Sequence, residues 1–279
     1  MEFKNLLLAQ EDGVLVVTLN RPEITNALVL EMIEELATLI DLIRVDPSVR
    51  VLVLTGSGKA FSAGGNVKSM GDSPEDDRAH PLRRPLWNIP TLTPADRLGK
   101  DRLTGMRVMK ALYALDKPII AAVNGVAAGA GMDMALACDI RIASEHASFR
   151  QAYVRVGLIP FDGGMYWLPR LVGPGRAAEM MLTGDPVDAA TAERIGLVNR
   201  VVPPEQLLPA AMELAKRLAN GAPIAQQMIK HMTRQAQTLS FPAALDLFYQ
   251  AVDVLFTTED HAEAVQAFQD RRPPSFKGR

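Results

Sequence analysis

The N-terminal part of the chain alternates between strand-like and helix-like patterns, and this alternation constrains the fold more than any other feature. Residues 14–19 read Val-Leu-Val-Val-Thr-Leu, an apolar and β-branched run that is typical of a buried strand. From Val29 to Ile43, apolar residues recur every three or four positions, which indicates an amphipathic helix. A second buried strand is expected at 51–55. The order strand–helix–strand predicts a parallel or mixed sheet with helical crossovers, and therefore an α/β fold.

The rest of the chain continues this pattern and then becomes helical. Strands are expected at 119–123, 140–143 and 198–202, and helices at 102–115, 222–236 and 242–270. Residues 71–105 hold five prolines and read as a long irregular surface excursion, for which a functional lid and a poorly ordered loop are both open interpretations. A shift in composition near 203–206 divides the chain into a core, residues 1–205, and a helical C-terminal region, residues 206–279.

Composition excludes several classes of protein. The 279 residues are 48% hydrophobic and 22% charged, which excludes disorder over most of the chain. A formal net charge of -2 gives no bulk attraction to nucleic acid or to an acidic membrane. The lone Cys138 excludes an internal disulfide framework and a cysteine-cluster metal site. No apolar run is long enough for a signal-peptide core or a membrane span, so we expect a cytoplasmic protein with no membrane partner.

Generic nucleotide and hydrolase motifs fail when they are tested residue by residue. Residues 56–59 (Gly-Ser-Gly-Lys) lack the earlier glycine and the following Ser or Thr of a phosphate-binding loop. Residues 129–131 (Gly-Ala-Gly) begin like a dinucleotide fingerprint, but Met134 stands where the third glycine belongs. The sequence contains no Gly-x-Ser-x-Gly and no His-Glu-x-x-His, and its four histidines are scattered. A serine hydrolase and a zinc enzyme therefore have no support, and we expect no metal.

Two other segments are far more specific when they are taken together. They read Phe-Ser-Ala-Gly-Gly-Asn-Val-Lys at 61–68 and Ala-Gly-Ala-Gly-Met-Asp at 128–133, the second preceded by Lys-Pro-Ile-Ile-Ala-Ala-Val-Asn-Gly at 117–125. This pair strongly resembles the enoyl-CoA hydratase/isomerase (crotonase) family. Shorter segments also agree, among them Leu-Asn-Arg-Pro at 19–22, Gly-Leu-Ile-Pro at 157–160 and Arg-Pro-Pro-Ser-Phe at 272–276. The resemblance covers nearly the whole chain except 71–105.

The resemblance implies a fold, a substrate and an assembly. The fold would be a superhelix of repeated ββα units with a helical C-terminal region that mediates trimerisation, often in hexamers built from two trimers. The substrate would be an acyl-CoA thioester, hydrated or isomerised as an enoyl-CoA, with no cofactor beyond the coenzyme A of the substrate. Thioester hydrolysis, C–C cleavage and a non-catalytic, RNA-binding role stay open as alternatives, although near-zero charge without basic–aromatic interleaving argues against RNA.

Reactions of this kind pass through an enolate, so negative charge builds up on the thioester oxygen. Two fixed backbone N–H donors at that oxygen would each contribute roughly 10²–10³ in rate. By their place in the motifs, the donors should be those of Gly65 and Ala130. Gly64 permits a close backbone approach, and Gly129 lies where a helix would direct free N–H groups and its positive dipole end at the oxygen.

The acid and base residues are less clearly defined by the sequence. The resemblance implies two glutamates, and their positions are occupied by Asp133 and Tyr153. Asp133 comes three residues after Ala130, on the same helix face, but it could also be an ordinary first-turn aspartate. Tyr153 is a poor base near its usual pKa of about 10, so it could form a hydrogen bond or fill the core. Asp162 is the other acidic candidate, with an Asp-Gly turn as its alternative.

Residues of the first motif would also bind the substrate. They are Ala63, Gly64, Gly65, Asn66, Val67 and Lys68, together with Gly129. Lys59 and Lys68 flank the motif and could meet the phosphates of coenzyme A, and Lys277 could do so from a neighbouring subunit. Solvated surface lysines are the alternative for all three.

Overall fold

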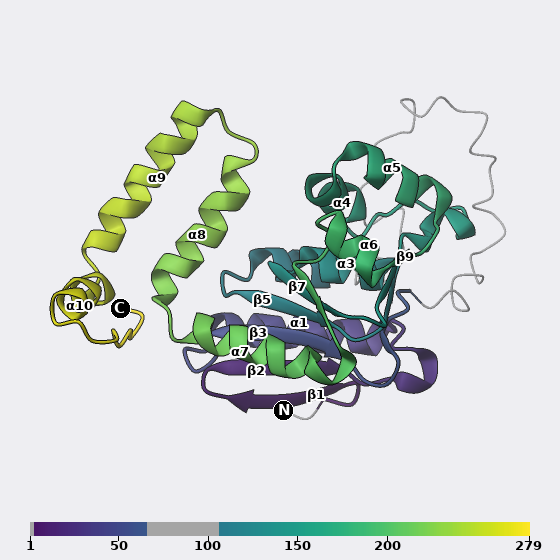
Figure 1. Ribbon diagram of the computed structural model, residues 1–279, viewed down its shortest axis with the longest axis horizontal. Helices are drawn as coiled ribbons and strands as arrows, with labels where there is room; N and C mark the ends of the chain where they lie inside the picture. Colours follow the sequence, from purple (N-terminus) through teal and green to yellow (C-terminus); the bar gives the residue numbers. More distant parts are fainter. Residues whose placement is uncertain (1–2, 66–105) are drawn as a thin grey trace.

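The computed structural model describes residues 3–65 and 106–279 (Figure 1). The predicted excursion at 71–105 and the candidate binding residues Asn66, Val67 and Lys68 therefore lie outside the described residues. A six-stranded sheet has the order β1 (Leu6–Glu11), β2 (Val14–Leu19), β3 (Val51–Gly56), β5 (Ile119–Val123), β7 (Ile140–Ser144) and β10 (Arg200–Val202). Strand β1 pairs antiparallel with β2, and the remaining pairs are parallel, as the strand–helix–strand pattern predicts.

A smaller sheet of four strands lies next to the first. Its order is β4 (Ala60–Ser62), β6 (Val126–Ala128), β8 (Ser148–Arg150) and β9 (Val187–Asp188), with β9 antiparallel to β8. Three strands of the large sheet each lead through a short turn into a strand of the small one: β3 into β4, β5 into β6, and β7 into β8. This repeated ββ unit, followed by helical structure, confirms the predicted architecture.

Helices connect and cover these units. They are α1 (Leu30–Val45), a helical segment at 106–114, α3 (Ala130–Ala137), α4 (Gly164–Val172), α5 (Pro174–Thr183) and α6 (Ala189–Arg194). Short 3-10 helices occupy Pro22–Ile24 (η1), Ala152–Val156 (η6) and Pro204–Gln206 (η7). The predicted amphipathic helix is α1, which buries Leu36, Ile40 and Ile43 against the sheet. Every residue of α3 is buried, because this helix lies in the middle of the molecule.

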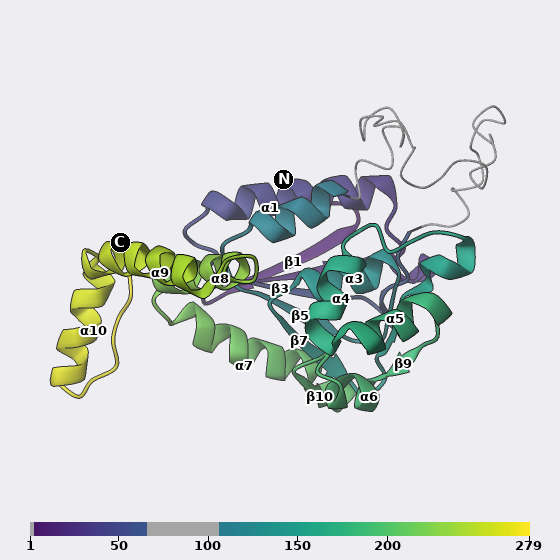
Figure 2. The ribbon, with the colours of Figure 1, turned by 90° about the horizontal axis from the view of Figure 1, so that it is seen from above.

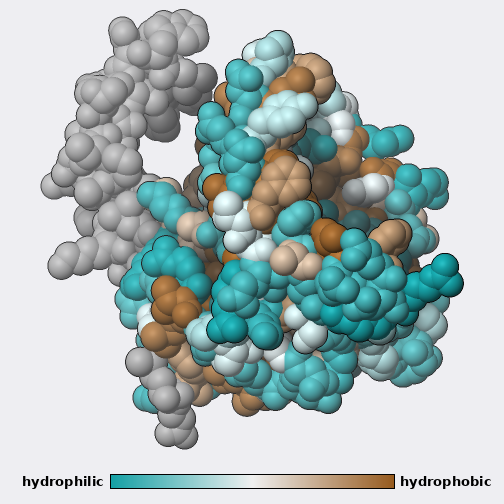
Figure 3. Space-filling model, turned by 90° about the vertical axis from the view of Figure 1, so that its left-hand side faces the viewer, coloured by the Kyte–Doolittle hydropathy of each residue, from teal (hydrophilic) through white to brown (hydrophobic). Residues whose placement is uncertain are grey.

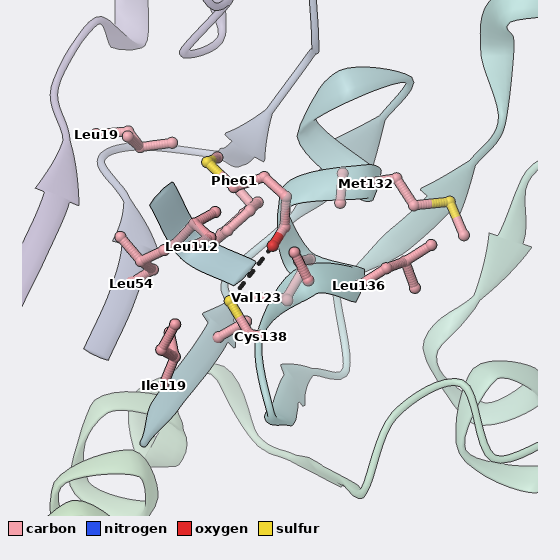
Figure 4. Packing of buried hydrophobic residues seen from close by; sticks show 14 of the residues in the cluster. Leu19, Leu54, Phe61, Leu112, Ile119, Val123, Met132, Leu136 and Cys138 are labelled. Carbon is pink, nitrogen blue, oxygen red and sulfur yellow. Dashed lines mark hydrogen bonds between the residues drawn. The ribbon is translucent and has the colours of Figure 1, made fainter. Parts of the chain in front are cut away.

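Figure 4 shows the core around this central helix. Phe61 from β4, Val123 from β5 and Leu136 from α3 meet there with Cys138. The Cys138 thiol lies 3.3 Å from the Met134 carbonyl oxygen, and burial raises its pKa to about 12. Cys138 is therefore a small core residue with an inert thiol.

The C-terminal region starts on the sheet and then leaves it. Helix α7 (Leu207–Ala219) packs Ala211 and Ala215 against the face of the large sheet opposite α1 (Figure 2). Helices α8 (Pro223–Ala236), α9 (Phe241–Phe256) and α10 (Glu259–Gln269) then reach away from both sheets (Figures 1 and 2). The predicted helical pattern at 242–270 is thus two helices, with the Thr258 side chain capping the second. The boundary between 205 and 206 stays a prediction.

One aspartate fastens α8 to the core. Asp139 Oδ2 lies 2.7 Å from Lys230 Nζ and accepts the backbone N–H of Ile119 at 2.8 Å. Its Oδ1 accepts a hydrogen bond from Arg234 at 3.0 Å. The Lys230 side chain is only 7% exposed, so Asp139 is the partner that compensates a buried ammonium group.

Replacing Asp139 should therefore destabilise the protein much more than removing an exposed ion pair. We expect Asp139→Ala to lower the free energy of unfolding by about 3 kcal/mol, because it leaves a buried lysine without its carboxylate. Asp185→Ala is the matched control. It removes an exposed pair with Arg155 and should cost less than about 1 kcal/mol. Equilibrium denaturation measures both, and equal losses would contradict the assigned role of Asp139.

Candidate active site

The two sequence motifs meet through their backbones. Gly64 has a φ of 83°, a conformation that favours glycine, and its carbonyl accepts the Leu28 N–H at 2.8 Å. A Cβ atom on Gly64 would clash with the carbonyl oxygen of Ala128 and lie 3.0 Å from the backbone nitrogen of Ala130. The turn after β4 therefore lies directly against the turn that begins α3, which only a residue without a side chain permits.

This contact brings the predicted oxyanion donors to one place. Ala130 is the first residue of α3, and Gly65 follows the close-packed Gly64. Within residues 3–65 and 106–279, neither the Gly65 nor the Ala130 N–H donates a backbone hydrogen bond. Ala130 also lies at the positive end of the α3 dipole, so both N–H groups are suited to an oxygen that carries negative charge.

Asp133 lies one helical turn further along α3 and has no exposed surface. Its Oδ1 accepts a hydrogen bond from Gln151 Nε2 at 2.6 Å, and its Oδ2 lies 2.8 Å from the hydroxyl of Tyr153. Burial raises the pKa of Asp133 to about 7, while the hydrogen bonds from Gln151, Tyr153 and the Gly164 backbone oppose that rise. Asp133 is therefore a buried, hydrogen-bonded carboxyl group and not a surface residue at the start of a helix.

Tyr153 joins the two candidate aspartates. Its hydroxyl oxygen lies 2.9 Å from Asp162 Oδ2 as well as 2.8 Å from Asp133 Oδ2, and its ring packs edge-to-face on Phe161. Burial, and then the two carboxylates, raise the pKa of Tyr153 far above its usual value. Of the two open interpretations of Tyr153, the structure shows both features, because the residue is buried and its hydroxyl is within hydrogen-bond distance of both aspartates. Asp162 is 7% exposed, and burial raises its pKa also.

A cavity of about 540 Å³ opens beside Asp162. Its lining residues are Met106, Met109, Lys110, Tyr113, Phe161, Asp162, Gly163, Tyr166 and Trp167. The sequence did not predict the aromatic members, because they come from parts of the chain that are far apart: Tyr113 from the helical segment 106–114, Phe161 from the turn before α4, and Tyr166 and Trp167 from α4. The only signal that the sequence gives for these residues is that they are aromatic in a chain where aromatic residues are rare, at 5%. The cavity can hold an apolar group next to a carboxyl group.

The remaining predicted binding residues lie in different surroundings. Ala63 is half-buried between β4 and Gly64, and Gly129 lies next to the Tyr153 ring, both at the site. Lys59 is exposed on the turn between β3 and β4. Lys277 belongs to the tail that Asp260 holds against α10, near the C-terminus, which lies away from both sheets (Figure 1).

Comparisons with known proteins agree with this fold. The sequence model described as enoyl-CoA hydratase/isomerase matches residues 9–88 and 99–279. A crotonyl-CoA hydratase of Syntrophomonas wolfei is 35% identical over 277 residues, covering 99% of each chain. A trans-2-decenoyl-[acyl-carrier-protein] isomerase of Streptococcus mutans is 33% identical, with 100% of each chain covered. The crystal structure of an enoyl-CoA hydratase from Bacillus anthracis superposes with a TM-score of 0.86 at 33% identity, covering 99% of this chain and 100% of that one.

The alternating ββ units define a crotonase-type fold. The chain belongs to the enoyl-CoA hydratase/isomerase family. Among the described residues, no helix is long and apolar enough to cross a membrane, and no three His, Cys, Asp or Glu side chains are grouped as a metal would require.

Gly64→Ala tests the backbone contact. The added methyl group would meet the Ala128 carbonyl in a backbone conformation that disfavours side chains, so we expect a loss of about 2 kcal/mol or more in the free energy of unfolding. Gly175→Ala in α5 is the control, because a Cβ there meets nothing within 4 Å. It should leave stability unchanged or raised by up to about 1 kcal/mol. Equal effects in denaturant titrations would contradict the contact.

Proposed function

We propose that the protein binds an acyl-CoA thioester and hydrates or isomerises an enoyl-CoA through a stabilised enolate. The observation that carries this proposal is the contact of Gly64 with the start of α3. It places two backbone donors within one helical turn of a chain of buried carboxyl groups. Such donors act by stabilising charge that develops only as the reaction proceeds.

The site residues divide the chemistry between them. The N–H groups of Gly65 and Ala130 would hold the thioester oxygen, so that addition at C3 or proton loss at C2 gives a stabilised enolate. Asp162 and Asp133 would supply and accept protons, and Tyr153 would hold both carboxyl groups in place. Burial raises the pKa of both carboxyl groups, and that of Asp133, about 7, lies near the operating pH at which a general acid or base works best.

Hydration is the first candidate, because relatives named as hydratases align over the full chain. Isomerisation is the second, and one observation favours it: of the two carboxyl groups, only Asp162 lines the cavity. A single carboxyl group can take a proton from one carbon and return it to another. A relative named as an isomerase is nearly as similar.

The surroundings suggest how the rest of the substrate is bound. The cavity beside Asp162 is lined mainly by aromatic and methionine side chains, which suits an apolar acyl group. The exposed Lys59 would meet the phosphates of coenzyme A, with Lys277 of a neighbouring subunit as a further candidate. Because backbone donors and carboxyl groups supply the chemistry, we propose that no cofactor is needed beyond the coenzyme A of the substrate. A cytoplasmic location stays a prediction.

The reaction is tested by incubating the protein with 2-enoyl-CoA and 3-enoyl-CoA and separating the products. Hydration gives a 3-hydroxyacyl-CoA, and isomerisation converts one enoyl-CoA into the other. We expect at least one of these products, and a decrease of at least about 100-fold in the double variant Asp133→Asn, Asp162→Asn. Release of free coenzyme A or of a shortened ester would instead indicate thioester hydrolysis or C–C cleavage.

We also propose that the C-terminal helices assemble the protein into a homotrimer or a hexamer. Helices α8–α10 leave apolar side chains exposed, among them Ile229, Phe241, Tyr249, Phe256 and Phe268. Figure 3 views the molecule from the side on which α9 and α10 lie and shows apolar residues among the hydrophilic ones. Phe268 is 85% exposed, which is unusual for a phenylalanine and favours burial against another subunit.

Light scattering coupled to size-exclusion chromatography tests this assembly. We expect three or six copies of the 30.3 kDa chain. Phe256→Asp combined with Phe268→Asp should shift the protein towards smaller species, because each change would bury a charge at the interface. Leu182→Asp, on equally exposed α5, is the control and should leave the mass unchanged. A monomeric native protein would refute the proposal.

A further inference from the structure

The geometry of Asp133, Tyr153 and Asp162 fixes how many protons they share. The Tyr153 hydroxyl oxygen is within hydrogen-bond distance of a carboxyl oxygen on both sides, 2.8 Å from Asp133 and 2.9 Å from Asp162. A tyrosine hydroxyl has one proton and donates to only one of them. The other contact is a hydrogen bond only when that carboxyl group is protonated and donates to the tyrosine oxygen. If Tyr153 donates to one carboxyl group, a hydrogen bond on its other side therefore requires that the second carboxyl group is a carboxylic acid.

The hydrogen-bond partners indicate which carboxyl group carries the charge. Apart from its contact with Tyr153, Asp133 accepts a hydrogen bond from Gln151 Nε2, and the Gly164 backbone also favours its charged form. Asp162 Oδ1 is buried and has no partner among the described residues. A buried carboxylate needs donors more than a neutral acid does, so we assign the charge at rest to Asp133 and the shared proton to Asp162, although the complete burial of Asp133 raises its pKa to about 7 and opposes this assignment.

The two carboxyl groups also differ in their access to substrate. Asp133 has no exposed surface, whereas Asp162 lines the cavity. We propose that Tyr153 is a proton relay through which the buried Asp133 switches Asp162 between its acid and base forms, and that Asp162 alone exchanges a proton with the substrate. The exchange of a proton between Asp162 and the substrate rests on the proposed function, whereas the relay through Tyr153 does not.

The switch moves two protons and creates no net charge. The O–H bond of Asp162 breaks as its proton passes to the Tyr153 oxygen, and the O–H bond of Tyr153 breaks as its own proton passes to Asp133 Oδ2. Tyr153 is neutral before and after, so no phenolate forms. The products are an Asp162 carboxylate, which can accept a proton from substrate or water, and a neutral Asp133. Asp162 would be the catalytic residue, with Tyr153 and Asp133 as positioning residues.

Among residues 3–65 and 106–279, few other ionisable groups face this chain. Lys110, from the helical segment 106–114, shares the cavity with Asp162. From β8 and the start of α4, the facing groups are the neutral Gln151 and the Gly164 backbone. Burial raises the pKa of both carboxyl groups above the usual 3.8, that of Asp133 to about 7. The shared proton should therefore persist at pH 6, where ordinary aspartates are ionised, and be lost as the pH rises through the raised pKa.

Infrared spectroscopy of the free protein tests the relay without any substrate. At pH 6 we expect a C=O band from one carboxylic acid that disappears at higher pH. The band should be lost in Asp133→Asn and also in Asp162→Asn. In either variant the asparagine amide donates to the Tyr153 oxygen, Tyr153 donates to the remaining carboxylate, and no extra proton is required.

A third substitution shows whether Tyr153 provides the connection. In a Tyr153→Phe background, Asp133→Asn should leave the band in place, because Asp162 then has no donor and stays protonated. If the band survives in Asp133→Asn with Tyr153 intact, the two carboxyl groups titrate independently and the relay is refuted. A wild-type protein without the band at pH 6 refutes it as well.

Proton exchange at C2 of a saturated acyl-CoA in D2O tests the role of Asp162. Asp162→Asn should slow deuterium uptake at least about 100-fold at every pH. Asp133→Asn should move the acidic limb of the pH profile to lower pH by about one unit, because Asp162 is then held as a carboxylate. Unchanged exchange in Asp162→Asn, or an Asp133→Asn profile identical to wild type, would overturn the assignment. A wild-type protein that neither binds nor exchanges acyl-CoA would refute the proposed function, while the infrared result would still decide the relay.

Discussion

The backbone contact between Gly64 and the turn before α3 is the constraint on which the site depends. It joins the ends of two successive ββ units, so the Gly65 and Ala130 N–H groups lie together although they are far apart in the sequence. Each sheet contributes to this arrangement. Strands β3 and β5 are neighbours in the large sheet, and β4 and β6 are neighbours in the small one, so the two turns are held in register. A side chain at Gly64 would separate them.

The burial of helix α3 explains why Asp133 forms a chain of hydrogen bonds with Tyr153 and Asp162. Helix α3 has no exposed residue except a slight exposure of Ala130, so Asp133 must find its partners inside the protein. It finds them in Gln151 and Tyr153, which lie at the end of the neighbouring ββ unit, and Tyr153 extends the chain to Asp162 at the cavity. Burial thus costs free energy and raises the pKa of both carboxyl groups.

The C-terminal helices depend on the same core. Asp139 follows α3 directly and fastens α8 through Lys230 and Arg234, while the guanidinium of Arg234 also lies over the ring of Tyr113 at 5.0 Å. Tyr113 in turn lines the cavity. The helices proposed to assemble the protein are therefore connected to the proposed acyl pocket through Arg234, which pairs with Asp139 and lies over the ring of Tyr113.

The sequence by itself determined the α/β class, the amphipathic α1 and the positions of Gly65, Ala130 and Asp133, because periodicity and short glycine motifs are local properties of the chain. The tertiary structure decided the rest. It showed that Tyr153 joins Asp133 to Asp162, that Asp162 rather than Asp133 reaches the cavity, and that Tyr113 and Trp167 line it. These relations depend on burial and on which distant segments meet, and no spacing in the sequence records them.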